Sequence, residues 1–298
     1  MSLVEAPEIH PNPGHPHEEF FAPWREARAT RYADYRPRRR WQRRRRAAVM
    51  TIAHNEPVFL PIWLGFYSRH FDASDIYVLD NDSTDGSTSG SGFVRVPVAH
   101  DSVDMQWINE TVSSFQHELL DRYDVVLFTD TDEILTPLPE WGGLREYVER
   151  LDEEFVNPLG YEVLHLRDRE PPLDPGRPVL DQRGYWFAHD GYDKPILATV
   201  PMTWVPGFHR SADGRHNYDP DLRLIHLRRV DYEIGLARRR ARAERPWAVR
   251  DVEEGWTAYN RVADEEEYER WFYEDSGFEE AGIHIVLEPI PPSWKGLF

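Results

Sequence analysis

Short apolar runs that end in polar residues recur along the first half of the chain. Val125–Phe128 is an uninterrupted run of four β-forming residues, too short for a helix, and such runs are typical of strands buried on both faces of a parallel sheet. Similar runs predict strands over Ala47–Ala53, Ile76–Leu79 and Phe93–Val98. Ser, Thr and Gly between 83 and 92 indicate a loop before the last of these.

Between these strands, apolar residues return at helical spacing over Val58–His70 and Met105–Arg122. Alternating strands and helices predict an α/β fold, with a mostly parallel sheet and helices on both faces. Further along, the pattern predicts a helix over Gly143–Asp152 and strands over Tyr161–Leu166 and Leu222–Leu227.

The ends of the chain differ in pattern from this middle part. Residues 1–46 read as an arm, rich first in Pro and His and then in Arg, and residues 47–230 as the main domain. Residues 231–298 read as a helical, charged extension, with a proline-containing tail from Ile283 that we expect to wrap the surface.

Composition narrows the class of protein. The chain has no Cys, which excludes a disulfide framework, a thiolate metal site and a cysteine nucleophile. No apolar run approaches the roughly 18 residues of a membrane span, and the N-terminal residues lack an apolar stretch of signal-peptide type. We therefore expect a soluble, cytoplasmic protein without a transmembrane segment.

Charge is distributed unevenly along the chain. The formal net charge is −18, yet residues 24–46 hold 11 Arg against Glu26 and Asp34. A second basic run, Arg238–Arg250, has six Arg and one Glu. Basic arms of this kind bind phosphate backbones and anionic surfaces, so the arm is a candidate for peripheral contact with such a partner.

An acidic cluster follows the strand predicted at 125–128. Asp130, Asp132 and Glu133 stand where that strand ends, and ligands of open α/β sheets bind beyond the carboxyl ends of strands. Three carboxylates in one place repel one another unless a cation or a basic partner is present. Two aspartates one residue apart offer hard oxygen ligands to Mg²⁺ or Mn²⁺, which in turn can hold a diphosphate.

The same Asp-x-Asp spacing occurs at Asp80/Asp82 and at Asp219/Asp221. Only the pair at 130 and 132 directly follows a four-residue apolar run and has a third carboxylate beside it. This context favours a metal or phosphate role for that pair, and the alternative is a solvated acidic turn.

Three motifs in order carry a resemblance to a known family. They are AHNE at the end of the first predicted strand, LDNDSTDGS at the second and FTDTDE at the fourth. Together they resemble the GT-A glycosyltransferases, specifically the family-2-like branch, over about residues 47–230. The resemblance implies a Rossmann-like GT-A fold, a nucleotide-sugar donor, an acceptor hydroxyl, Mn²⁺ or Mg²⁺ as cofactor, and transfer with inversion.

Carried over by motif, the resemblance implies roles for single residues. Asn55 and Glu56 would lie near the ribose or base, and Asp80 would accept a hydrogen bond from the base. Asp130 would lie by the ribose or a metal-bound water, and Asp132 would ligate the metal.

Some members of the fold add a late histidine to the metal ligands, and His226 in LIHL resembles that position, with His209 as the next candidate. Imidazole is a suitable ligand for Mn²⁺. Lys194, one of only two lysines, is a candidate for contact with phosphate or for a solvated loop position.

An inverting transferase also needs a base for the acceptor hydroxyl. The candidates are Asp190, Asp193, Glu162 and Asp168, and we favour Asp190 because it lies in a predicted loop just before Lys194. The chain lacks a recognisable Glu-Asp pair of the usual family type there.

Two other classes of function fit parts of the pattern. A strand followed by Asp-x-Asp also resembles haloacid-dehalogenase-like phosphatases, in which Asp130 would be the nucleophile; those domains begin with that strand, whereas about 125 residues precede it here. A non-enzymatic protein that binds nucleic acid or an anionic surface through Arg36–Arg46 is the second alternative.

Overall fold

The computed structural model describes residues 45–255, 264–274 and 285–298. The strands are β1 (Ala47–Ala53), β2 (Ile76–Asn81), β3 (Val94–Val98), β4 (Val125–Phe128), β5 (Glu133–Pro137), β6 (Phe155–Leu164), β7 (Tyr185–Ala188), β8 (Leu197–Ala198), β9 (Tyr218–His226) and β10 (Glu288–Pro289). The helices are α2 (Phe59–Tyr67), α3 (Met105–Leu120), α4 (Leu144–Arg150), α5 (Tyr232–Ala243), α6 (Val249–Glu253) and α7 (Glu265–Tyr273). The predicted N-terminal arm and its arginine run, apart from residues 45 and 46, lie outside the described residues.

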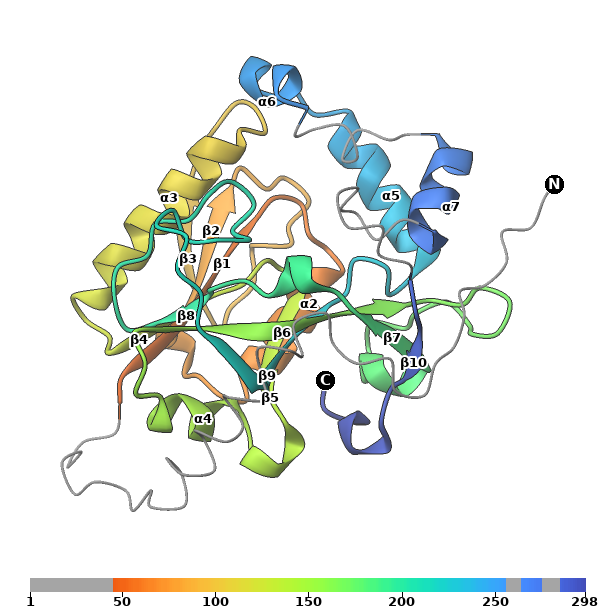
Figure 1. Cartoon of the computed structure of the whole chain (residues 1–298). Helices are drawn as coiled ribbons and strands as arrows, with labels where there is room; N and C mark the ends of the chain where they lie inside the picture. Colours follow the sequence, from red (N-terminus) through yellow and green to blue (C-terminus); the bar gives the residue numbers. More distant parts are fainter. Residues whose placement is uncertain (1–44, 256–263, 275–284) are drawn as a thin grey trace.

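The strands of the described residues form one mixed sheet (Figure 1). Its main path is β10-β7-β6-β8-β4-β1-β2-β3, and β9 pairs with both β5 and β6. Strands β1 to β4 are parallel to their neighbours within that group. Strand β8 lies antiparallel between β4 and β6 and so joins this parallel part to the rest of the sheet. The predicted α/β class is confirmed, and most of its parallel pairing lies in the N-terminal half.

The elements of the N-terminal half follow their predicted ranges closely. Strands β1 and β4 have the predicted bounds, and β2, β3, α2 and α3 differ from prediction by a few residues at an end. Helix α3 begins where Asp104 caps it, because the Asp104 side chain accepts a hydrogen bond from the backbone N–H of Trp107. Local periodicity suffices here because most of these elements are buried on the side that their pattern indicates; β3, which has no buried residue, is the exception.

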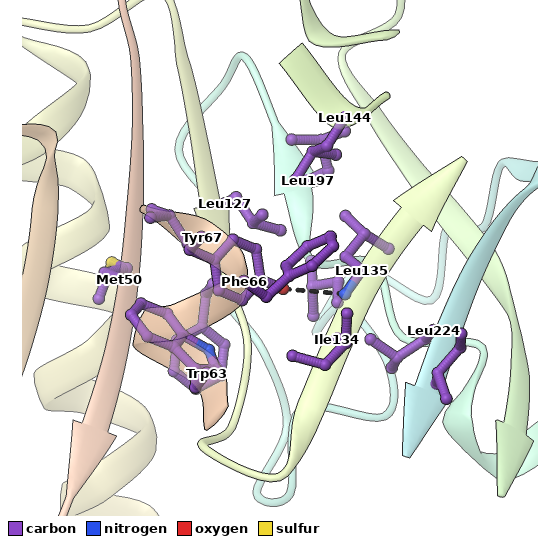
Figure 2. Close-up of a cluster of buried hydrophobic side chains, with 14 of the residues drawn as sticks. Met50, Trp63, Phe66, Tyr67, Leu127, Ile134, Leu135, Leu144, Leu197 and Leu224 are labelled. Carbon is purple, nitrogen blue, oxygen red and sulfur yellow. Dashed lines mark hydrogen bonds between the residues drawn. The ribbon is translucent and has the colours of Figure 1, made fainter. Parts of the chain in front are cut away.

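The helix α2 packs its aromatic face against β5 (Figure 2). Trp63, Phe66 and Tyr67 are buried beside Ile134 and Leu135, within the main hydrophobic core. The hydroxyl oxygen of Tyr67 accepts a hydrogen bond from the backbone N–H of Leu135 at 2.8 Å. This packing fixes the start of β5, and therefore the turn that leads into it from β4.

The second half of the sheet differs from the predicted pattern at several strands, of which β5 and β6 bear most directly on the site. Strand β5 begins within the acidic cluster, which the pattern does not identify as a strand. Strand β6 begins at Phe155, well before the predicted Tyr161. The sequence pattern misses its first residues because Pro158 and Gly160 ordinarily indicate a turn. A Cβ at Gly160 would approach the carbonyl oxygen of His189 to 2.5 Å, so close backbone contact explains this glycine.

A second hydrophobic cluster, called here the aromatic cluster, joins α5 and α7 to the ends of β6 and β7. Its members are Leu164, Leu166, Phe187, Tyr232, Leu236, Tyr268, Trp271, Phe272, Tyr273, Ile285 and Leu287. Helix α5 can approach α7 because Gly235 has no side chain, and a Cβ there would collide with the hydroxyl of Tyr268. Residues on both sides of position 230 share this cluster, and the division of the chain at 46 and 230 stays a prediction.

The tail does not lie on the surface alone. From residue 285 onward, Leu287, Ile290, Trp294 and Phe298 are all buried, and Glu288–Pro289 pairs with β7. The prolines that predicted a surface segment alternate with apolar residues that fill the core. No helix of the described ranges is long and apolar enough to cross a membrane.

Candidate functional site

Three loops carry the sequence motifs to one edge of the sheet. Because β1 is parallel to both β2 and β4, with Ala53 opposite Asp80 and Met50 opposite Phe128, the three strands end side by side. The loop after β1 begins at His54, the loop after β2 follows Asn81, and the turn after β4 holds the acidic cluster. The expected convergence of the three motifs is therefore present in the fold.

Asn55 ties the first loop to the second. Its backbone has a positive φ of 52°, which asparagine tolerates better than most residues. Its side-chain oxygen accepts hydrogen bonds from the backbone N–H groups of Thr84 and Asp85 at 2.7 and 3.2 Å. Its own backbone N–H donates to the hydroxyl of Ser83 at 3.1 Å. Asn55 thus shapes the loop predicted to hold the nucleotide, and its contact with a base or ribose stays a prediction.

Asp80 is buried at the end of β2 and both of its oxygens are engaged. One accepts from the backbone N–H of Ser83 at 3.0 Å, and the other from Nε of Arg95 at 2.7 Å. Burial acts to raise the pKa of Asp80, but the hydrogen bonds from Ser83 and Arg95 lower it below its ordinary value. A carboxylate held in this way is ionised and can accept a further bond, so its predicted role toward a base stays open to test.

The turn after β4 is closed by its own third carboxylate. The side chain of Glu133 accepts from the backbone N–H of Asp130 at 3.0 Å, and the backbone N–H of Glu133 donates to the carbonyl of Asp130 at 3.1 Å. Glu133 is fully buried, whereas the side chain of Asp130 is 34% exposed. Within the acidic cluster, Glu133 is therefore a structural carboxylate, whereas Asp130 is an accessible one.

Lys194 supplies the cation that these two carboxylates need. Its Nζ lies 2.5 Å from an oxygen of Glu133 and 3.0 Å from one of Asp130, and its side chain is 3% exposed. Burial acts to lower the pKa of Lys194, but the two carboxylates raise it well above its ordinary value. An ammonium has three donors, so one remains for a further acceptor such as a phosphate oxygen. The predicted phosphate contact of Lys194 remains a prediction.

Arg238 of α5 supplies the second cation. Its guanidinium bonds Glu56 through Nε at 3.0 Å and Nη2 at 2.6 Å, and contacts Asp132 through Nη1. Both carboxylates are buried. Burial acts to raise the pKa of Asp132, but Arg238 and then His226 hold that pKa well below its ordinary value. At Glu56 the effect of burial is larger than that of Arg238, so the pKa of Glu56 is raised. Arg238 therefore joins the loop after β1 to the turn after β4.

His226 ends β9 beside this group. Its Nδ1 lies 2.8 Å from an oxygen of Glu162, its ring stacks on Tyr192 with centroids 4.2 Å apart, and its Nε2 lies 3.9 Å from Glu133. Burial acts to lower the pKa of His226, but Glu162 and Asp132 raise it above its ordinary value. A carboxylate on Nδ1 orients the ring and leaves Nε2 as the nitrogen that could bind a metal.

The base candidates are dispersed. Glu162 holds His226, Asp193 is buried and accepts from the backbone N–H of Gly160 at 2.6 Å, and Asp168 is exposed. Asp190 has a side chain 30% exposed and acts on the pKa of Tyr218, which begins β9 at the end opposite to His226. The role of Asp190 as a base stays a prediction.

The reserve metal candidate, His209, is held differently. Its Nδ1 lies 2.5 Å from the carbonyl oxygen of Gly191. Burial, and then the charge of Lys194, lower its pKa to about 3. The imidazole is consequently neutral near pH 7 and adds no charge to the site.

The donor types present suit a hard divalent cation. In the described residues, no three His, Asp or Glu side chains stand together as a ready metal site. However, Asp132 and the partly exposed Asp130 offer oxygen, His226 offers Nε2, and Arg238 now supplies the positive charge that Asp132 requires. Carboxylate oxygen suits both Mn²⁺ and Mg²⁺, and an additional imidazole ligand favours Mn²⁺ over Mg²⁺.

The sequence pattern indicated the carboxylates but not their partners. Arg238 lies more than 100 residues from Asp132, within a run of arginines whose spacing does not single it out. The sequence offers Glu162 as a candidate base, whereas in the structure Glu162 is the partner of His226. The rule that clustered carboxylates need a cation was the one available signal, and it predicted that such a partner exists without naming it.

The chain is similar to several solved structures, each at low identity. No family model and no curated protein sequence matches the chain. Among solved structures, it is similar to a mannosyltransferase from Pyrobaculum calidifontis in complex with GDP-Man and Mn²⁺, at 17% identity over 76% of this chain and 71% of that one, with a TM-score of 0.36.

The chain is also similar to glucosyl-3-phosphoglycerate synthase from Mycobacterium tuberculosis in complex with Mn²⁺, UDP and glucosyl-3-phosphoglycerate. The identity is 21% over 52% of each chain, with a TM-score of 0.28, so the chain spans about half the length of that enzyme. At these identities and TM-scores, neither neighbour identifies the function of this chain.

Proposed function

We propose that this chain is a metal-dependent glycosyltransferase that moves a sugar from a nucleotide-sugar donor to an acceptor hydroxyl, with inversion. The observation that carries the proposal is the convergence of Glu56, Asp132 and His226 from three separated elements on one edge of the sheet. Such an edge is where open α/β sheets bind nucleotides.

In this proposal the residues of the site have separate roles. Asn55, Glu56 and Asp80 shape the pocket for the nucleoside, with Asp130 beside the ribose. Asp132 and His226 would hold Mn²⁺ or Mg²⁺, and a divalent ion there neutralises charge that develops on a leaving diphosphate. Lys194 keeps Asp130 in place and offers its remaining N–H to phosphate, and Asp190 is the proposed base.

The two alternatives are not favoured. A haloacid-dehalogenase-like domain would begin with the strand before Asp130, whereas β4 here follows three strands and lies inside the sheet between β1 and β8. Binding of nucleic acid or an anionic surface by Arg36–Arg46 concerns residues that, apart from Arg45 and Arg46, lie outside the described ranges.

The test is nucleotide binding by the Asp132→Ala variant. Calorimetric titration with UDP and GDP, each with and without Mn²⁺, should show Mn²⁺-dependent binding that weakens at least about tenfold in the variant, since even residues that only support a metal ligand have effects of this size. We also expect the variant to lose about 1–3 kcal/mol of stability, because removal of the buried Asp132 carboxylate leaves Arg238 paired with Glu56 only.

Asp221→Ala is the matched control. Asp221 belongs to the other Asp-x-Asp pair on β9, and its side chain accepts from Nε1 of Trp141 at 2.8 Å, far along the strand from His226. It should leave Mn²⁺-dependent nucleotide binding unchanged. Equal binding by folded Asp132→Ala and by the unaltered protein would refute the assignment of the metal to this turn.

A further inference from the structure

Three ionisable side chains lie in a row across strands β5, β9 and β6. In the pairing of β5 with β9, His226 lies opposite Glu133, and in the pairing of β9 with β6 it lies opposite Glu162. Residues directly opposite one another on neighbouring strands share a face of the sheet. All three side chains are buried. The backbone N–H of Leu227 also donates to the carbonyl oxygen of Asp132 at 2.8 Å, so the row lies against the acidic cluster.

Glu162 holds the imidazole of His226 in one orientation. Nδ1 of His226 lies 2.8 Å from one oxygen of Glu162, and the other oxygen accepts from the backbone N–H of Arg229 at 3.0 Å. An ionised carboxylate can only accept, so the contact of 2.8 Å requires a proton on Nδ1. The backbone N–H of Arg228 lies farther from Nδ1, at 3.3 Å, and the charged contact is the stronger one. Nε2 is therefore the nitrogen that can bind a metal once it has lost its own proton.

A stack of aromatic rings fixes the plane of the same imidazole. The ring of Tyr192 lies parallel to that of His226, with centroids 4.2 Å apart and 5° between the planes. Tyr192 stacks on His189 as well, at 4.4 Å. Stacking sets the plane of the imidazole, and the bond to Glu162 sets its rotation within that plane. Nε2 is held 3.9 Å from an oxygen of Glu133, too far for a hydrogen bond.

We propose that Glu162 is a positioning residue that makes the site selective for Mn²⁺ over Mg²⁺, because it directs Nε2 of His226 at the metal. The inference rests on the proposed function, in which Asp132 and His226 hold the ion. Carboxylate oxygen suits both ions, so the selectivity depends on how the imidazole nitrogen is presented. A carboxylate on the other ring nitrogen fixes the tautomer and raises the basicity of a ligating histidine. Because Glu162 is fully buried, it acts through His226 and not on a substrate.

The experiment titrates the full chain with MnCl₂ alone, followed by the EPR signal of free Mn²⁺, and then with MgCl₂ as competitor. Glu162→Gln should weaken Mn²⁺ binding about tenfold to a hundredfold, the usual range for a residue that supports a metal ligand. Glutamine has the size of glutamate but a single accepting oxygen, so it cannot accept from both Nδ1 of His226 and the backbone N–H of Arg229. Mg²⁺ binding should change much less, because Mg²⁺ depends mainly on oxygen ligands.

Asp219→Asn is the matched control. Asp219 is a buried carboxylate at the end of β9 opposite to His226, and it accepts from the hydroxyl of Tyr147 at 2.5 Å. The substitution likewise turns a buried carboxylate into an amide, but the ratio of Mn²⁺ to Mg²⁺ affinity should stay that of the unaltered protein. An equal fall of this ratio in both variants would overturn the proposal, because it would assign the effect to a general loss of structure.

A double variant tests whether Glu162 acts through His226. His226→Ala should weaken Mn²⁺ binding, and Glu162→Gln added to it should cause no further loss. A further loss as large as that of Glu162→Gln alone would overturn the proposal. Glu162→Asp is the variant to use if Glu162→Gln does not fold, since it keeps the charge beside His226 but withdraws the oxygens from Nδ1. It too should lower the affinity for Mn²⁺, and an unchanged affinity would count against the proposal.

The same titrations separate this inference from the proposed function. Weaker Mn²⁺ binding in His226→Ala together with unchanged binding in Glu162→Gln would overturn the inference alone. No Mn²⁺ binding by the unaltered protein, or unchanged binding in Asp132→Ala, would overturn the metal site of the proposed function and the inference with it. Since the titrations contain no nucleotide and no acceptor, a failure of sugar transfer would leave the role of Glu162 standing.

Discussion

The N-terminal half of the sheet and the aromatic cluster place charged groups in different surroundings. At the edge of the sheet, carboxylates and cations alternate, as in Glu133–Lys194–Asp130 and Glu56–Arg238–Asp132. In the aromatic cluster, guanidinium groups lie on rings, with the buried Arg229 4.1 Å from the centroid of Trp271. Charged side chains therefore lie in two environments in one fold: among groups of opposite charge at the edge of the sheet, and on aromatic rings beside α5 and α7.

The largest effect should come from breaking the first environment at Lys194. Lys194→Met leaves Glu133 fully buried without its cation, and loss of one partner of a buried ion pair costs about 3–5 kcal/mol. Urea unfolding at pH 7 measures this loss. Lys295→Met is the control, because Lys295 donates to the carbonyl oxygen of Arg183 at 2.6 Å rather than to a carboxylate, and should cost about 1 kcal/mol. Similar losses for both lysines would show that Lys194 is not a charge partner.

Arg238 belongs to both environments, and its removal should have a smaller effect. Arg238→Met leaves the buried Glu56 and Asp132 without their cation, but the Arg238 side chain is 20% exposed, so water can reach the space that it leaves and we expect a loss of about 1–3 kcal/mol. Mn²⁺ should restore much of it, since an ion at Asp132 would supply the missing charge. The measurement is the rise in melting temperature on adding Mn²⁺, which should be larger in Arg238→Met than in the unaltered protein. An equal rise would place any bound metal elsewhere.

The smallest effect concerns pH and a histidine beside the aromatic cluster. Nε2 of His165 lies 3.1 Å from the carbonyl oxygen of Glu170, and its Nδ1 accepts from the backbone N–H of Tyr232 at 3.2 Å, so the imidazole is neutral. Burial, and then Arg183, lower its pKa; Asp231, 3.8 Å away, and Glu170 act in the opposite direction.

Because the unfolded chain binds this proton more tightly, His165 contributes stability that is complete above about pH 6.5 and is lost as pH falls below it, by at most about 1.4 kcal/mol per pH unit. Denaturant unfolding between pH 5 and 8 should show this dependence reduced in His165→Gln. An unchanged pH profile in the variant would mean that the pKa of His165 is the same in the folded and unfolded states.

The two regions also differ in how far the sequence predicts them. In the N-terminal half each element is a local run, and Val125–Phe128 followed by Asp130 and Asp132 indicates both the strand and its acidic end. Strand β6 escapes prediction because its Pro158 and Gly160 are explained only by contacts with distant segments. Likewise Arg238 gains its role from where α5 packs, and packing between distant elements leaves no periodic signal in the sequence.

Two of the outer strands of the sheet, β10 and β3, bear on how the protein avoids self-association. Strand β10 is two residues long, and β3 carries Arg95 and Pro97. Short outer strands, charged side chains and proline all hinder the addition of a further strand from another molecule. Arg95 thus has two roles, because it places a charge on an outer strand and also stabilises the ionised form of Asp80. An apolar residue at position 95 would disturb the loop after β2 and, at the same time, leave an outer edge more open to aggregation.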